Sequence, residues 1–157
     1  MMYAVRLHQI IAYTAILPLG VTCLSPARAD TCTGYDVLVT QSADTADLGR
    51  GLKQTTVKQS SVVLSNDSIY RMLTGECSVT VLQTPDGKSQ MQGFCARRDK
   101  DGDTGSIAVR LSPGADKIEW KNTGGTGKFA GKQDSGWAQN VLTDGKMSVV
   151  KWGGDCH

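Results

Sequence analysis

Histidine and glutamate are scarce in this 157-residue sequence, which has two of each. The histidines are His8 and His157, and the glutamates are Glu76 and Glu119. Because each histidine lies near an end of the chain, a triad in which imidazole activates a serine or cysteine gains little support. Either glutamate could act as a general base in an apolar cleft, although such residues more often lie on the outer face of a strand. We therefore assign no catalytic residue from the sequence.

An excess of one charge sign is also missing. Lys and Arg number 17 against 15 Asp and Glu, and two of the basic residues, Arg6 and Arg28, lie among the first 29 residues, which contain no acid. The rest of the chain is neutral, so nucleic acid is not expected as a partner. The hydrophobic fraction of 39% is too high for a disordered chain, and the length fits one domain.

The first 29 residues have the pattern of a secretory signal peptide. Arg6 gives a positive start, and residues 10–24 form an apolar run too short for a bilayer, which needs about 20 residues. A small-x-small triplet ending at Ala29 matches a cleavage site, so the mature chain is expected to begin at Asp30. We expect one domain, residues 30–157, in the periplasm or the medium, with no membrane span. An uncleaved membrane anchor is the alternative.

The cysteines agree with export. Beyond residue 29 the chain keeps an even number, expected to form disulfides: Cys32, Cys77, Cys95 and Cys156. A three-residue turn at Pro85–Gly87 would pair Thr84 with Lys88, and counting back places Cys77 opposite Cys95. The two remaining cysteines would then join the ends of the domain. No Cys-x-x-Cys spacing occurs, so neither a metal centre nor a cofactor is expected.

Short apolar runs separated by turn residues predict an all-β fold, and no window keeps a helical period. Only Ala43–Lys58 could hold a short helix, and its polar residues suit an exposed strand or loop equally well. Regular strands and stapled termini favour a closed antiparallel barrel of about eight strands. The extended segments expected are Asp36–Thr40, Ser61–Leu64, Ile69–Leu73, Cys77–Leu82, Ser89–Ala96, Ile107–Leu111, Lys117–Lys121, Gly136–Leu142 and Met147–Trp152.

Two polar stretches could carry chemistry. The glycine-rich run Gly124–Lys132 lacks the spacing of a nucleotide phosphate loop, so its glycines indicate a tight connection from which Phe129 turns inward to close a barrel end. Alternating acids in Asp99–Gly105 resemble the start of a calcium loop, but Thr104 and Arg110 occupy the positions where a helical calcium hand needs Gly and Glu. A hairpin turn with solvated or paired acids is the favoured interpretation.

The glycine run, preceded by Trp120-Lys121-Asn122-Thr123, resembles the glycine-rich connection of dirigent-like and allene-oxide-cyclase-like barrels. It is also similar to small exported bacterial proteins of uncharacterised function, in which a cysteine-containing strand and an Asp-Gly-Asp turn precede the run, as Cys95 and Asp101–Asp103 do here. The resemblance implies an eight-stranded antiparallel barrel. Dirigent proteins orient phenolic radicals and the cyclases act on fatty-acid epoxides, but their functional residues match no positions here, so neither activity is implied.

Three tryptophans, Trp120, Trp137 and Trp152, fall in consecutive expected strands. Together with Phe129 they either line a cavity for a small apolar ligand or fill the barrel core. We therefore expect an exported, disulfide-bonded barrel without enzymatic activity that binds a small apolar ligand or a protein partner. The alternatives are a cyclase- or isomerase-type enzyme with Glu76 or Glu119 in the cavity, and a purely structural envelope protein.

Overall fold

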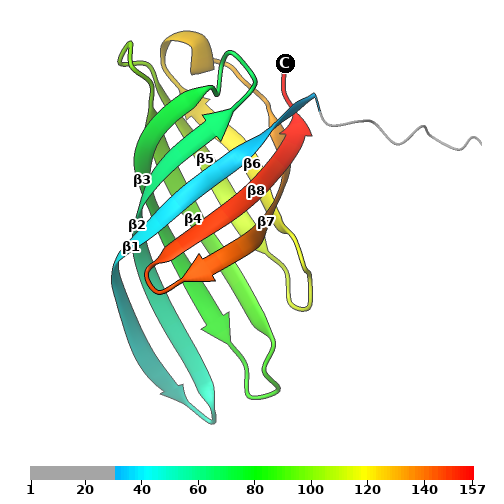
Figure 1. The fold of residues 1–157 in the computed structure, drawn as a ribbon. Helices are drawn as coiled ribbons and strands as arrows, with labels where there is room; N and C mark the ends of the chain where they lie inside the picture. The colour runs from blue at the N-terminus through cyan, green and yellow to red at the C-terminus, as the bar shows by residue number, and fades with distance from the viewer. Residues whose placement is uncertain (1–30) are drawn as a thin grey trace, which may run out of the picture.

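A computed structural model describes residues 31–157, which form one closed antiparallel barrel (Figure 1). Each strand pairs with the next along the chain, and the last pairs with the first. This confirms the expected all-β barrel and its number of strands. The strands are β1 (Cys32–Gly49), β2 (Leu52–Ser65), β3 (Met72–Gln83), β4 (Ser89–Arg98), β5 (Thr104–Leu111), β6 (Ile118–Gly125), β7 (Ser135–Asp144) and β8 (Met147–Asp155), with a short 3₁₀ helix, η1 (Gly127–Phe129), between β6 and β7.

Alternation of side chains along each strand separates the interior of the barrel from its outer face. In β3, for example, Leu73, Cys77 and Val79 are buried, whereas Glu76 and Ser78 between them are exposed. The interior contains most of the buried apolar side chains, as expected for a small barrel filled by its own residues. Within residues 31–157, no helix is long and apolar enough to span a membrane.

Both expected disulfides are present. Cys77 pairs with Cys95 across β3 and β4, in the register that the turn predicts, with Thr84 N donating to Lys88 O at 2.9 Å. The second disulfide joins Cys32 at the start of β1 to Cys156 after the end of β8, with Cα atoms 5.8 Å apart. It therefore ties together the two ends of the described chain, beside the seam where the barrel closes.

Two local expectations need correction. Residues 66–71 form a turn, so the expected extended segment Ile69–Leu73 lies partly in this turn and partly at the start of β3, and the nine expected segments form the eight strands of the barrel. The stretch Ala43–Lys58 contains no helix; it belongs to a long hairpin of β1 and β2. Its tip has positive φ at Gly49, Arg50 and Gly51, a conformation that glycine adopts without steric cost and that reverses the chain within two residues.

The two ends of the barrel differ. The closed end carries the turns 66–71 and 99–103, the connection 126–134 and both termini of the described chain. At the open end, β1 stays paired with β2 as far as Gly49, but its pairing with β8 stops at Val39. The β1–β2 hairpin therefore projects beyond the tip of the β7–β8 hairpin, so the wall formed by β1 and β2 is high at the open end and the adjacent wall formed by β7 and β8 is low (Figure 1).

Candidate functional site

Four buried aromatic rings close one end of the barrel: Tyr70, Trp120, Phe129 and Trp152. We call them the aromatic plug. Tyr70 lies with its ring centroid 5.9 Å from those of Phe129 and Trp152, and Trp152 meets Trp120 edge-on at 6.1 Å. Glycine is required beneath the indoles, since a Cβ at Gly34 would lie 2.6 Å from the Trp152 ring and one at Gly154 would lie 2.6 Å from the Trp120 ring.

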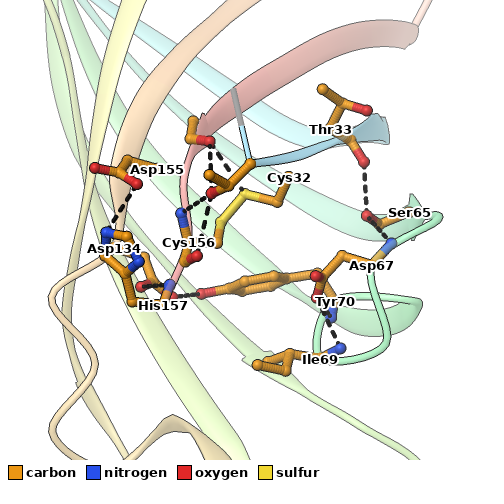
Figure 2. The surroundings of a disulfide bond; sticks show 12 residues. Cys32, Thr33, Ser65, Asp67, Ile69, Tyr70, Asp134, Asp155, Cys156 and His157 are labelled. Atoms are coloured by element: carbon orange, nitrogen blue, oxygen red, sulfur yellow. Dashed lines mark hydrogen bonds and ion pairs between the residues drawn. A yellow bond between two sulfur atoms is a disulfide. The ribbon is translucent and has the colours of Figure 1, made fainter. Parts of the chain in front are cut away.

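A hydrogen-bonded pair anchors the aromatic plug to the C-terminus (Figure 2). The Tyr70 hydroxyl donates to Asp134 Oδ2, and the backbone N–H of His157 donates to Asp134 Oδ1 at 2.9 Å. Asp134 is almost completely buried, and Cys156 beside it forms the disulfide with Cys32. Burial, together with the hydrogen bond to the Asp134 carboxyl, raises the pKa of the Tyr70 phenol far above its usual value. The phenol therefore stays protonated and keeps donating at physiological pH.

Replacing Tyr70 by Phe is expected to lower the free energy of unfolding by about 1–3 kcal/mol at neutral pH, because Asp134 Oδ2 loses its buried donor. Because the pKa of Tyr70 is higher in the folded state than in the unfolded state, the stabilisation that Tyr70 provides depends on pH. Tyr70 contributes its full stabilisation below the unfolded-state pKa of about 10 and loses it as the pH rises above that value. The difference in stability between wild type and Tyr70→Phe, measured by urea denaturation, should therefore shrink above about pH 10. A constant difference would show that the phenol is not the titrating group.

A polar cluster lies inside the barrel beneath the aromatic plug. Arg97 on β4 places Nη2 2.5 Å from Asp36 Oδ2 on β1, and Ser61 on β2 donates its hydroxyl to Asp36 Oδ1 at 2.7 Å. Asp36 is 5% exposed and the Arg97 side chain 15% exposed. Burying one charge alone costs several kcal/mol, so the cluster is tolerable only because the carboxylate and the guanidinium neutralise each other.

Two cavities adjoin this cluster, and Arg97 lines both. The smaller, about 40 Å³, lies between Arg97 and the aromatic plug. The larger, about 90 Å³, is lined by Asp36, Gln59 and Arg97 together with apolar side chains from six strands, among them Leu38 and Val109. Arg97 Nε is buried and has no hydrogen-bond partner within residues 31–157. Arg97 thus lines both cavities and carries one buried N–H donor that no described residue accepts.

The lumen continues towards the open end along the high wall. Val57 on β2 lies directly opposite Val79, which lines the larger cavity, and Thr55 lies opposite Val81 one step nearer the open end. Partners in an antiparallel register point to the same side of the sheet, so these half-buried side chains extend the inner surface beyond the cavity. This surface forms a mainly apolar approach to Arg97.

The structure brings together only some of the residues singled out in the sequence. Trp120 and Trp152 lie inside and line the smaller cavity, while Phe129 is buried in the aromatic plug. Trp137 pairs with the exposed Glu119 on the outer face of β6 and β7, and Lys117 Nζ lies 4.6 Å from its ring centroid. It therefore contributes to neither lumen cavity.

The carboxylate in the lumen is not one of the glutamates. Glu76 and Glu119 are both exposed on outer strand faces, whereas Asp36 faces inward in phase with Leu38. The signal for Asp36 is present in the sequence, because it is an acid that alternates in step with apolar neighbours. Arg97 similarly follows the buried Cys95 at a spacing of two. Residues in phase with a buried cysteine face the core, and this rule would have identified both.

The acidic turn holds no free cluster of ligands. Asp99 accepts the backbone N–H groups of Asp101 and Asp103 through Oδ1, and its Oδ2 lies 2.8 Å from Lys128 Nζ. Within residues 31–157, no group of three metal-binding side chains converges. The turn is thus an internally satisfied hairpin connection.

Comparison with known proteins identifies the fold. No family model matches the chain, and no curated protein matches it. Among solved structures, the barrel is similar to that of the pterocarpan synthase dirigent protein GePTS1, with a TM-score of 0.50 and 16% sequence identity, covering 78% of this chain and 80% of that chain. The likeness at this identity concerns the fold, and it confirms the dirigent-like barrel expected from the glycine-rich run.

Proposed function

We propose that this barrel is a non-enzymatic binding protein that takes a small, mainly apolar molecule into its lumen through the open end. The observation that carries the proposal is the unpartnered Arg97 Nε, buried among apolar walls. Buried donors are nearly always satisfied, so an orphaned donor on a side chain that lines two cavities favours a partner supplied from outside the chain. A ligand with one acceptor oxygen on an apolar body fits this arrangement.

The size of the lumen limits the ligand. Its larger cavity of about 90 Å³ is well below the roughly 300–1,000 Å³ of sites for drug-sized molecules. It is also smaller than the cavity of about 150 Å³ known to hold a benzene ring. The polar head of the ligand would therefore reach Arg97 while the remainder lies along Val57 and Val81 towards the open end. The name of GePTS1 assigns it a small organic product, which supports a small-molecule role for the fold.

An enzyme of cyclase or isomerase type is the second candidate, because Asp36 lines the larger cavity. Its two carboxylate oxygens already accept from Ser61 and Arg97, which ties the group into the barrel. A general base must reach the proton it removes, and these contacts favour binding over catalysis.

The test uses phenol and benzoate as probes, with toluene as the matched probe that lacks oxygen. Chemical shifts of backbone amides are followed in wild type and in Arg97→Lys, which keeps a charge beside Asp36 but lacks Nε. Phenol and benzoate should each shift the amide signals of the strands around the larger cavity. Arg97→Lys should lower the affinity for both about tenfold and leave the affinity for toluene unchanged. Arg110→Lys, an exposed arginine on β5, is the control. Amide shifts confined to residues on the outer face of the barrel would contradict binding in the lumen. An equal loss of affinity for all three probes in Arg97→Lys would contradict it as well.

We further propose that the protein is exported through a signal peptide at residues 1–29. These residues lie outside the part of the chain that the structure describes. Two disulfides are consistent with an oxidising compartment, such as the periplasm or the medium. N-terminal sequencing of the exported protein should begin at Asp30. An unprocessed chain recovered in a membrane fraction would contradict export by cleavage.

A further inference from the structure

A second hollow lies on the outside of the barrel at the closed end. It has a volume of about 440 Å³ and is formed by the β2–β3 turn, the ends of β3 and β4, the β4–β5 turn and η1. We call it the basic hollow, because four cationic side chains and two carboxylates line it: Arg71, Arg98, Lys100 and Lys128, with Asp99 and Asp101. Arg97 and Asp36 are not among its lining residues, so it is separate from the lumen.

Both carboxylates in the basic hollow are already paired. The buried Asp99 pairs with Lys128 at 2.8 Å, and this contact is the main reason that the pKa of the Asp99 carboxyl is lowered. The exposed Asp101 pairs with Lys100 at 2.6 Å. The two lysines and two aspartates therefore balance in charge, and the two arginines remain as excess positive charge.

The arginines have no such partners. Within residues 31–157, neither Arg71 nor Arg98 makes a side-chain hydrogen bond or ion pair. The hydroxyls of Ser68 and Thr74 in the same wall are also unpaired by any described residue. Thr74 lies directly opposite Arg98 in the β3–β4 register, so both point to the outer face side by side. Two guanidinium groups and two hydroxyl groups, all of them hydrogen-bond donors, thus line the basic hollow.

We infer that the basic hollow binds a small molecule carrying a phosphate or sulfate monoester. Guanidinium groups donate pairs of parallel hydrogen bonds to such oxyanions, and a tetrahedral group can accept from two forks and from hydroxyls at once. Met72, which is 64% exposed in the same wall, offers an apolar contact for the organic part of the ester. The site is built from side chains; the glycine-rich run contributes Lys128, which holds Asp99 rather than the anion.

The test is titration calorimetry at low salt with glucose 6-phosphate, glucose 6-sulfate and glucose. At least one of the two esters should bind, and glucose should not. The ester that binds more tightly shows whether the basic hollow prefers a phosphate or a sulfate monoester. Arg71→Gln and Arg98→Gln should each weaken binding about tenfold, since each removes charge-assisted hydrogen bonds. Added salt should weaken binding further because the hollow is open to solvent.

The matched control is Arg110→Gln, which changes an exposed arginine outside the basic hollow and should bind the ester as wild type does. Both arginines of the hollow are exposed, so their variants should keep the wild-type melting temperature. Failure of both esters to bind at millimolar concentration, or equal losses in Arg98→Gln and Arg110→Gln, would overturn the inference. Binding of glucose as tight as that of its esters would do the same.

Discussion

Arg97→Met is expected to lower the free energy of unfolding by about 3–5 kcal/mol, the largest loss expected from a single substitution in the lumen. Methionine fills similar space but removes the guanidinium 2.5 Å from Asp36 Oδ2. Asp36 is 5% exposed and would keep only the Ser61 hydroxyl as a donor, so its charge would be left uncompensated in an apolar interior. Urea denaturation monitored by tryptophan fluorescence measures the loss.

Two further variants separate the charge effect from simple loss of packing. Adding Asp36→Asn to Arg97→Met removes the orphaned charge, so the double variant should recover a large part of the lost stability. Arg110→Met, on the outer face of β5, should change the stability by less than about 0.5 kcal/mol. If Arg97→Met behaved like Arg110→Met, the lumen would have to be filled with water, and the argument for an apolar binding site would fail.

Replacing Cys32 and Cys156 together by serine is expected to lower the free energy of unfolding by about 4–5 kcal/mol. The disulfide closes a loop with a sequence separation of 124, and its loss restores that conformational freedom to the unfolded chain. The Cys77–Cys95 disulfide closes a separation of only 18, so its removal should cost about 3 kcal/mol. Denaturation of the two double-serine variants under the same conditions compares them directly.

The order of the two losses is the decisive result. Cys156 also precedes His157, whose backbone N–H donates to Asp134, so freeing the C-terminus should loosen the aromatic plug as well. Asn122 N donates to Asp134 O at 2.8 Å. Faster amide exchange at Asn122 and Tyr70 in the variant lacking the Cys32–Cys156 disulfide would therefore report this loosening. A larger loss for the Cys77–Cys95 pair would contradict the role given to the terminal disulfide.

Local sequence patterns predicted much of the barrel. The Pro-Asp-Gly turn set the β3–β4 register, and that register predicted one disulfide and, by elimination, the other. The segment at Ile69–Leu73 was misplaced because its apolar residues belong partly to a turn, where Tyr70 packs into the aromatic plug. A run of apolar residues alone does not distinguish a strand from a buried turn.

The contacts between residues of the lumen could not be predicted from local sequence patterns in the same way. Asp36 and Arg97 are 61 residues apart and meet only because β1 and β4 face each other across the interior. Trp137 depends on distant partners as well: its neighbours Gly136 and Ala138 face inward because Trp120 and Trp152 already fill that side of the barrel. The sequence pattern grouped Trp137 with Trp120 and Trp152 because all three fall in consecutive expected strands. Which face of a strand is buried depends here on partners distant in the chain.

Native mass spectrometry of the protein purified from its native source tests the central claim most directly. We expect a co-purifying small molecule whose mass is lost on denaturation, and a lower occupancy in Arg97→Lys than in wild type or Arg110→Lys. Detection of the ligand at equal occupancy in all three proteins would place it outside the lumen. A protein without any bound molecule in every sample, combined with no response to phenol or benzoate, would contradict the claim that this barrel is a small-molecule binding protein.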